Sequence, residues 1–392
     1  MTAPRPAAGA EPAWLAELAA ARRAWADDDL LRTLRDAEPA GRQLHVDGRA
    51  LVNLASNDYL ALSSHPRLIE AAVEAIRRWG VGSGASRLVA GTLPIHSEVE
   101  RKFAAFKHAE AALLCPTGFM ANLAAITSLA GPGDLVCLDK LCHASLIDAA
   151  RASGATVRVF PHLGYDKLRR LLATRTGRAV ILTDSVFSMD GDVADLPVLC
   201  DVAREHEAIL IVDEAHGTGV LGEHGTGLCE SQGVSDRVDV VISTASKAMG
   251  GLGGIITARQ IVIDAIVNRG RSFIYTTAIP PGQAAAIGAA ATVITDEPWR
   301  RQRVLQLSAR VRQTLGLHGT VTPIIPVVTG SAASALQLST SLREAGFFAP
   351  AIRPPTVAPG KARVRLSLRA DLEDADIDRL LDAWHDRHVA AG

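Results

Sequence analysis

The stretch VDVVISTASKAMGGLGG, residues 238–254, decides how this 392-residue chain is interpreted. Its apolar start, residues 238–242, is typical of a strand buried in a parallel sheet. Small polar residues and Lys247 follow, and then four glycines within five residues. A lysine directly after a buried strand lies where water is scarce, so we expect the pKa of its ammonium group to fall and its amine to attack carbonyl carbons. The glycines let the backbone close around a bulky group, whereas the alternative is a turn lysine with its charge in solvent.

An alternation of apolar strands and helices surrounds this stretch. Strands are predicted at residues 109–115, 135–138, 155–160, 179–184, 208–212, 238–242 and 254–257. Continuous apolar strands that alternate with helices indicate a mainly parallel sheet covered on both faces. The sequence therefore predicts an α/β fold.

The length of the chain predicts more than one domain. A chain of 392 residues, 48% of them hydrophobic, can bury a sizeable core but exceeds what one core usually holds. We expect an N-terminal tail and helix over residues 1–45, a large domain over 46–281 and a smaller α+β domain over 282–392. Residues 1–11 are rich in proline and alanine and are predicted to be disordered.

Two local patterns organise the N-terminal region. Trp14 to about Arg35 is rich in Ala, Leu and Arg and predicts a helix. Residues 46–54 predict a hairpin around Asp47-Gly48, because both residue types accept the positive φ angles of a two-residue turn.

Charge and cysteine usage exclude several classes of partner. The formal net charge of −1 gives no reason to expect nucleic acid or an anionic membrane. The five cysteines form no C-x-x-C pair and predict buried thiols of a reducing compartment, and no His, Cys and Asp spacing suits a metal. The sequence has no pattern of a signal peptide and no apolar run of about 18 residues. We therefore expect a cytoplasmic protein.

Three predicted strands end in residues that can carry chemistry. His143 follows one strand, Asp213 and His216 follow another, and Lys247 follows a third. In such sheets ligands bind beyond the carboxyl ends of the strands. Taken alone, Asp213 could cap a helix and each histidine could be a satisfied core residue. Together they supply an amine for an aldehyde, a carboxylate for a pyridinium proton and a ring for stacking, which is what pyridoxal phosphate (PLP) requires.

Each of these side chains has an expected role. Asp213 would keep the pyridine nitrogen protonated, and His143 would lie flat on the ring. His216 and Ser188 would bind the phenolic oxygen. Lys247, once displaced by the substrate amine, would take the α-proton. The phosphate is expected at Thr244 and at the backbone of Gly118 and Phe119, where a helix is predicted to begin.

A second glycine motif points to a different cofactor. Residues 217–222 match G-x-G-x-x-G and follow a strand, as in nicotinamide-binding folds. A lone match is weak evidence, and here Asp213 to His216 separate the strand from the glycines. Further glycines, Gly225 and Gly227, continue the loop where a helix should begin. We therefore favour PLP over a dinucleotide.

Long motifs in a fixed order identify a family. The stretches SNDYL, TGFMAN, HASLIDAA, TDSVFSMDGD, VDEAHGTGVLGEHGTG, STASKAMGGLGG, SFIYTTAIPP and AIRPPTVAPG resemble the α-oxoamine synthases. These are PLP enzymes of fold-type I, with the aspartate-aminotransferase fold, and the resemblance runs from about residue 40 to the C-terminus. Within the family, AIRPPTV and FSMDGD favour condensation of L-alanine with a pimeloyl-thioester, carried by coenzyme A or a carrier protein, as in biotin synthesis. Glycine or serine with another acyl-thioester is the alternative, and a non-catalytic binding protein on the same fold is a third.

The resemblance implies further site residues. Lys247, Asp213 and His143 would be the catalytic residues, and Gly118, Phe119, Ser188, His216 and Thr244 would contact the cofactor. Arg353 is similar to the arginine that grips the amino-acid carboxylate, and Thr356 to a threonine that contacts substrate. Arg32 resembles an N-terminal arginine that meets the acyl-thioester, and Asn57 in SNDYL would also contact substrate. Thr277 resembles a threonine that reaches the phosphate of the neighbouring subunit, which implies a homodimer with shared sites.

Overall fold

The computed structural model describes residues 12–390, with side chains as far as residue 385. The stretch predicted to be disordered, residues 1–11, lies outside this part. Contacts divide the chain into two compact units. One comprises the described residues before Leu54 together with Pro326–Leu366, and the other comprises Leu54–Ile325 with the described residues from Ser367 onward. These bounds differ from the predicted division after residues 45 and 281, which stays a prediction.

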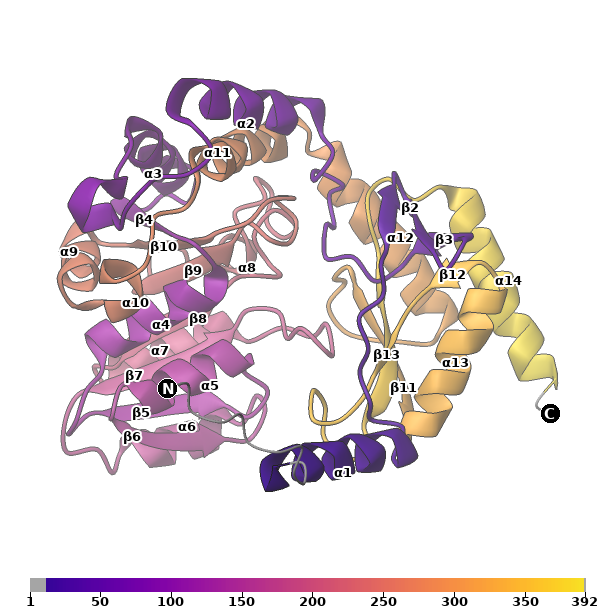
Figure 1. Ribbon diagram of the computed structural model, residues 1–392. Helices are drawn as coiled ribbons and strands as arrows, with labels where there is room; N and C mark the ends of the chain where they lie inside the picture. The colour runs from indigo at the N-terminus through magenta and orange to yellow at the C-terminus, as the bar shows by residue number, and fades with distance from the viewer. Residues whose placement is uncertain (1–11, 391–392) are drawn as a thin grey trace, which may run out of the picture. The chain divides into compact units, whose positions relative to one another are not determined.

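A seven-stranded sheet forms the centre of the larger unit (Figure 1). Its order is β4 (Ala111–Cys115), β10 (Gly254–Ala258), β9 (Val240–Thr244), β8 (Ile209–Asp213), β7 (Ala179–Asp184), β5 (Leu135–Asp139) and β6 (Thr156–Phe160). The strand β10 is antiparallel to β4 and to β9, and the remaining pairs are parallel. The predicted mainly parallel α/β sheet is therefore confirmed, with β10 reversed.

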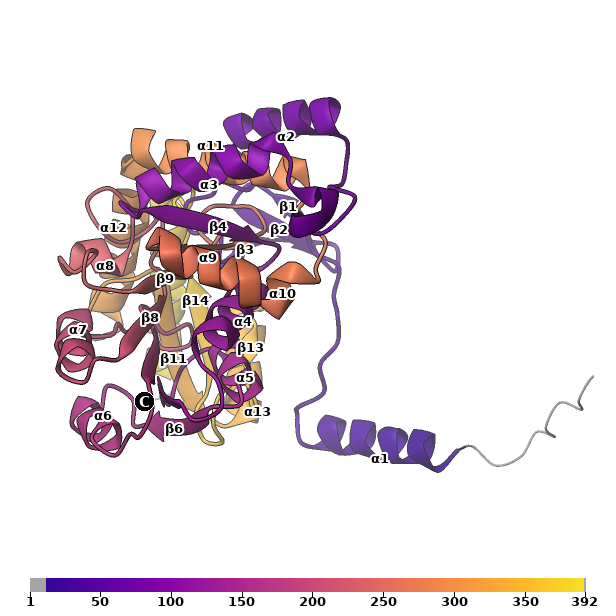
Figure 2. The same ribbon diagram turned by 90° about the vertical axis from the view of Figure 1, so that its left-hand side faces the viewer.

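Helices cover both faces of this sheet (Figure 2). One face carries α4 (Gly118–Leu129), α5 (Ala144–Ala152), α9 (Gln260–Arg269) and α10 (Arg271–Ile274), and the other carries α6 (Tyr165–Leu172) and α7 (Leu196–Glu205). Every residue of β4, β5 and β7 is buried. Strands covered on both faces lack a solvent side, which explains why their sequences are apolar without alternation.

Three helices pack together beside β4. The alanine-rich helix α11 (Pro281–Asp296) contacts α2 (Pro66–Trp79) and α3 (Pro94–Phe106) (Figure 1). Its small residues allow this close approach: a Cβ atom on Gly288 would lie 3.0 Å from Val99 Cγ2. A short π-helix, η1 (Arg87–Gly91), precedes α3 and was not predicted. The unit is completed by α8 (Leu228–Ser231), α12 (Trp299–Thr314) and α14 (Asp374–Ala390).

The smaller unit contains the predicted hairpin. The strands β2 (Gln43–Val46) and β3 (Arg49–Asn53) pair through Val46 and Arg49, and Asp47 and Gly48 between them have φ angles of 49° and 74°. Two positive φ angles define the turn that matches the twist of paired strands. The strands β1 (Glu38–Ala40) and β12 (Phe347–Phe348) complete a four-stranded sheet. A three-stranded sheet consists of β11 (Ile324–Gly330), β14 (Ala362–Ser367) and β13 (Ala351–Ile352).

Two helices belong to the smaller unit, and the first is shorter than predicted. They are α1 (Ala13–Asp27) and α13 (Ala332–Glu344). The prediction that α1 extends to about Arg35 is wrong. Asp29 adopts a left-handed φ of 58°, and the amides of Leu30 and Leu31 both return to the carbonyl of Trp25. A left-handed residue cannot continue a right-handed helix.

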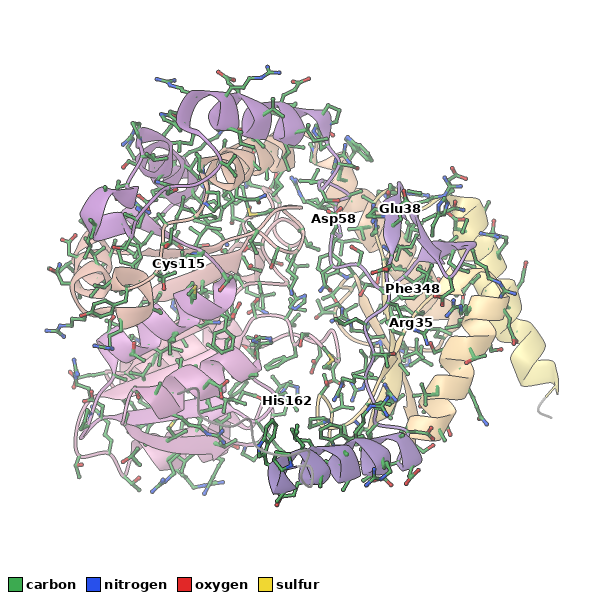
Figure 3. The ribbon with its side chains drawn as sticks, viewed as in Figure 1. Arg35, Glu38, Asp58, Cys115, His162 and Phe348 are labelled. Carbon is green, nitrogen blue, oxygen red and sulfur yellow. The ribbon has the colours of Figure 1, made fainter. Side chains whose placement is uncertain are left out.

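Two further features concern membranes and cysteines. Within residues 12–390, no helix has both the length and the apolar character needed to cross a membrane. All five cysteines are buried free thiols, and Figure 3 labels Cys115 in β4. Burial raises the pKa of the Cys115 thiol to about 12.

Candidate active site

A cavity of about 280 Å³ lies where β7, β8 and β9 end. It is lined by seven of the residues predicted from sequence, namely Gly118, Phe119, His143, Asp213, His216, Thr244 and Lys247. These residues come from four loops or helix starts that are up to about 130 positions apart in the chain. The parallel arrangement of the strands places their carboxyl ends side by side.

Asp213, the last residue of β8, is the buried carboxyl group of this cavity. It is 5% exposed, and its two oxygens accept hydrogen bonds from Asn122 Nδ2 at 2.7 Å and from the amide of Ala215 at 2.8 Å. Burial raises the pKa of Asp213, although these hydrogen bonds and the charges of His143 and Lys247 act in the opposite direction. A cation bound beside Asp213 would lower the pKa of this carboxyl group again, because its positive charge favours the ionised carboxylate.

A second carboxyl group, Asp184, ends the neighbouring strand in register with Asp213. Its Oδ2 accepts a hydrogen bond of 2.8 Å from the amide of His143. Burial and the nearby charge of Asp213 raise the pKa of Asp184 well above its usual value. Of the two groups, Asp184 has the stronger tendency towards the neutral form, because Asp213 accepts two hydrogen bonds and the charges of His143 and Lys247 favour its carboxylate.

His143 is fixed as the N-terminal cap of α5. Its Nδ1 lies 2.8 Å from Ser145 Oγ and accepts a hydrogen bond of 3.2 Å from the amide of Ser145. Ser145 Oγ in turn accepts from Asn122 Nδ2 at 2.8 Å, so its own proton points to His143. In the neutral imidazole this leaves the proton on Nε2. Asn122 thereby connects His143, through Ser145, with Asp213.

The start of α4 supplies a site for an anion. Thr117 caps this helix by accepting a hydrogen bond of 3.1 Å from the amide of Met120. Gly118 packs closely on β9, since a Cβ atom there would lie 3.2 Å from Thr244 Cβ. The first amides of a helix lack partners within the helix and favour negative charge. Thr244 Oγ1 donates to the carbonyl of Gly253 at 2.9 Å and lies 2.9 Å from Ser246 Oγ, so Ser246 is a further polar group at this end of the cavity.

His216 is hydrogen-bonded to Tyr59. Its Nδ1 lies 2.7 Å from Tyr59 Oη, and Tyr59 Oη lies 3.1 Å from Asn57 Oδ1. Asn57 does not line the cavity but is connected to it through these two hydrogen bonds.

Two other predicted cofactor contacts lie outside the lining of the cavity. Ser188 is half-buried in the turn after β7, which is closed by the hydrogen bond of 2.8 Å from the amide of Gly191 to the carbonyl of Phe187. Thr277 is exposed and pairs with Ser86 in an isolated β-bridge. Their roles stay predictions.

The predicted substrate residues Arg32, Arg353 and Thr356 belong to the smaller unit and lie together there. Arg32 donates to the carbonyl of Pro354 at 3.1 Å and to Thr356 Oγ1 at 3.5 Å. Arg353 donates to the carbonyls of Asp29 and Leu31. The structure thus groups these three side chains, and their contact with substrate stays a prediction.

Four residues of this network were missed by the sequence analysis: Asn122, Ser145, Asp184 and Tyr59. Asn122 lies one helical turn after Gly118, so it faces the same side of α4, and this spacing could have revealed it. Asp184 ends a buried strand just as Asp213 does, which is the same signal. No sequence pattern places Tyr59 against His216.

Comparisons with known proteins identify the family. The profile of aminotransferases of class I and II matches residues 49–383, and the chain belongs to this family. A putative 8-amino-7-oxononanoate synthase of Desulforudis audaxviator is 45% identical over 360 residues, covering 90% of this chain and 94% of the relative. The 8-amino-7-oxononanoate synthase of Anaeromyxobacter dehalogenans is 45% identical over 361 residues, covering 90% and 91%.

Solved structures share the fold. A serine palmitoyltransferase of S. paucimobilis with bound PLP and myriocin superimposes with a TM-score of 0.91 and 27% identity, covering 98% of this chain and all of that one. An 8-amino-7-oxononanoate synthase of Francisella tularensis superimposes with a TM-score of 0.73 and 28% identity, covering 86% and 96%. The predicted fold-type I architecture and the resemblance to α-oxoamine synthases are therefore confirmed.

Proposed function

We propose that this chain is a PLP-dependent acyltransferase that condenses L-alanine with a pimeloyl-thioester. The products are 8-amino-7-oxononanoate, carbon dioxide and the free thiol of coenzyme A or a carrier protein. The observation that carries the proposal is the convergence of Lys247, Asp213 and His143 on one cavity. The curated relatives that are 45% identical over 90% of the chain carry the name of this activity.

The residues around the cavity fit PLP. The cofactor has a basic ring nitrogen, an aldehyde and a phosphate, and the cavity offers a buried carboxyl group, a lysine amine and a helix start. Asn122 Oδ1 is buried and forms no hydrogen bond within the described part of the chain, which leaves an acceptor for a bound group. The raised pKa of Asp213 is consistent with a site whose cationic partner arrives with the ligand.

Each side chain then has a task. When bound, PLP supplies an electron-accepting ring that stabilises negative charge on the substrate α-carbon. Asp213 would hold a proton on the ring nitrogen, while Asn122 keeps its carboxylate oriented. Lys247 Nζ would be the covalent attachment point and, once released, would take the α-proton of alanine. His143, whose Nε2 carries its proton in the neutral ring, would stack on the ring and donate to substrate. The phenolic oxygen would be bound by Ser188 and His216. The phosphate would be bound by Thr244 and by the amides of Gly118 and Phe119.

The remaining roles concern substrate and assembly. The carboxylate of the amino acid would be bound by Arg353 and Thr356. The acyl-thioester would be bound by Arg32 and Asn57. Thr277 would reach the phosphate of a second copy in a homodimer. Val81, Leu88 and Val89 flank the bridge between Ser86 and Thr277 and are 78%, 54% and 80% exposed, which supports an apolar surface available to such a partner. We expect the enzyme to act in the cytoplasm.

A related activity is the second candidate. The serine palmitoyltransferase structure has the higher TM-score, 0.91 against 0.73, which favours serine or glycine with another acyl chain. Sequence identity favours alanine and a pimeloyl group, because it is 45% to the synthases and 27% to the palmitoyltransferase.

Thiol release tests the proposal. Purified protein with PLP is assayed with alanine, glycine and serine against pimeloyl-, acetyl-, succinyl- and palmitoyl-thioesters. Alanine with the pimeloyl-thioester should give the highest kcat/KM, and Lys247→Ala should abolish turnover while the circular dichroism spectrum is unchanged. Turnover with glycine or serine alone would overturn the substrate assignment. A protein that develops no visible absorbance band with PLP would overturn the enzyme class.

A further inference from the structure

A chain of two hydrogen bonds leads from Asn57 through Tyr59 to His216. The hydroxyl of Tyr59 is 2.7 Å from His216 Nδ1 and 3.1 Å from Asn57 Oδ1. Tyr59 is 0% exposed and His216 is 5% exposed, so water does not replace these partners readily. A ligand that reaches His216 through a ring nitrogen must therefore use Nε2, because Nδ1 is engaged by Tyr59.

The backbone around Tyr59 is held in place. Its carbonyl accepts a hydrogen bond of 2.8 Å from the amide of Ala370. The neighbouring Asp58, labelled in Figure 3, accepts from the amide of Leu62 at 2.8 Å and from Ser63 Oγ at 2.7 Å. These contacts anchor the backbone that carries the Tyr59 side chain.

A tyrosine hydroxyl has one proton, so it can donate in one direction only. If Tyr59 donates to Asn57, His216 must carry a proton on Nδ1, and a neutral ring then has none on Nε2. If Tyr59 donates to His216, a neutral ring carries its proton on Nε2, and Asn57 turns its amide nitrogen to Tyr59. The two ends of an asparagine amide are assigned from such networks, so the distance from Asn57 to Tyr59 is by itself compatible with either end.

We propose that Tyr59 is a positioning residue that donates to His216 Nδ1 and so places the ring proton on Nε2. The shorter of the two distances, 2.7 Å, is the one to His216. This inference rests on the proposed function, in which His216 meets a phenolic oxygen, since that oxygen is an acceptor and requires a donor on Nε2. Asn57 is then coupled to the cofactor site, because the orientation of its amide follows the direction of the Tyr59 hydroxyl.

Nitrogen-15 NMR of protein labelled at histidine tests this directly, without any turnover. Long-range nitrogen–proton spectra distinguish a protonated from an unprotonated ring nitrogen, and His216→Asn assigns the resonance among the 12 histidines. We expect unprotonated Nδ1 and protonated Nε2, with and without PLP. A proton on Nδ1 of wild-type His216, in a neutral or a charged ring, would overturn the proposal.

The variant Tyr59→Phe provides the second measurement. It keeps the buried ring and removes only the hydroxyl, so the ring proton of His216 should redistribute between both nitrogens. The pKa at which the visible band of bound cofactor titrates should also shift by about half a unit to one unit, the size of one hydrogen bond. Tyr165→Phe is the matched control, because it removes a hydroxyl that accepts from the amide of Asp195 at 2.8 Å, outside the cavity lining. Tyr165→Phe should leave both measurements unchanged.

The outcomes separate this proposal from the proposed function. If Tyr59→Phe leaves the proton distribution of His216 and the titration of the band unchanged, Tyr59 has no positioning role. If wild-type protein binds no PLP, the proposed function fails, and the wild-type spectrum still determines whether Tyr59 fixes the tautomer. If Tyr59→Phe does not fold, as judged by circular dichroism, the nitrogen-15 spectrum of the wild-type protein alone decides whether the proton of His216 lies on Nε2.

Discussion

His162 is held to Asp192 by a hydrogen bond of 2.6 Å between Nε2 and Oδ2. On the other side of the ring, Nδ1 lies 3.0 Å from Asp139 Oδ1. A neutral imidazole has one proton, so two carboxylate partners require the charged ring. His162, labelled in Figure 3, thereby joins the last residue of β5, the strand that precedes His143, with the segment after β7 that also contains Ser188.

This arrangement predicts how stability depends on pH. Burial by itself would lower the pKa of His162, but the hydrogen bonds and charges of Asp139 and Asp192 outweigh it and raise the pKa to about 10. Because the pKa is higher in the folded state than in the unfolded state, the stabilisation is fully present below about pH 6.5 and is lost as pH rises through about 10. His162→Gln should cost about 2 kcal/mol of unfolding free energy at pH 6 and progressively less towards pH 10. Urea unfolding of both proteins across this range checks it, and a cost that does not change with pH would contradict the charged ring.

The two carboxyl groups at the cavity should respond differently to amide substitution. Asp184→Asn should retain most activity at pH 7, because burial already favours the neutral form of Asp184 and the amide oxygen can still accept from the amide of His143. Asp213→Asn should lower kcat/KM by a factor of about 100 or more, because an amide cannot hold a proton on the ring nitrogen. Steady-state kinetics with matched PLP loading compares them. An equal loss of kcat/KM in both variants would contradict the prediction that Asp213 acts as a carboxylate and Asp184 as a neutral group.

Gly118→Ala should weaken PLP binding. The added Cβ atom would lie 3.2 Å from Thr244, so either the start of α4 or the end of β9 must shift by a few tenths of an ångström. We expect the dissociation constant for PLP to rise roughly fivefold to tenfold, corresponding to about 1 kcal/mol. Gly131→Ala is the control, since a Cβ atom there meets nothing within 4 Å. Absorbance titration with PLP measures both, and unchanged affinity in Gly118→Ala would argue against a phosphate at this helix start.

A buried ion pair supports the loop after β8. Lys107 Nζ lies 2.9 Å from Glu214 Oε2, and Glu214 Oε1 accepts from the amide of Cys229 at 2.7 Å. The side chains are 5% and 0% exposed. Lys107→Met would leave a buried carboxylate without its cation and should destabilise the protein by about 3–5 kcal/mol.

The matched tests for this pair are a double variant and a surface control. Lys107→Met with Glu214→Gln should recover part of the loss, because the uncompensated charge is removed. Lys140→Met, at an exposed lysine, should change the unfolding free energy by less than about 0.5 kcal/mol. Chemical denaturation measures all three proteins. A double variant as unstable as Lys107→Met alone would contradict the charge argument.

The sequence predicted those parts of the site that follow from strand periodicity. Lys247, Asp213 and His143 could be placed on one edge because parallel strands end side by side, and the Asp47-Gly48 turn followed from local conformational preference. The reversal of β10 could not be predicted, because a buried strand has the same apolar pattern in either direction. The contact between Tyr59 and His216 joins residues 157 positions apart, and no local pattern encodes it.

The reversed direction of β10 determines what position 254 can tolerate. Gly254 begins this strand and is paired with Thr244 of β9 on one side and with Cys115 of β4 on the other. A Cβ atom at this position would lie 2.3 Å from the carbonyl oxygen of Thr117 and 2.8 Å from Ala121 Cβ. Any side chain here would separate the two chain segments proposed to share the phosphate. Among libraries of variants selected for growth that depends on this enzyme, position 254 should therefore accept glycine alone, whereas position 131, where an added Cβ atom meets nothing within 4 Å, should also accept alanine.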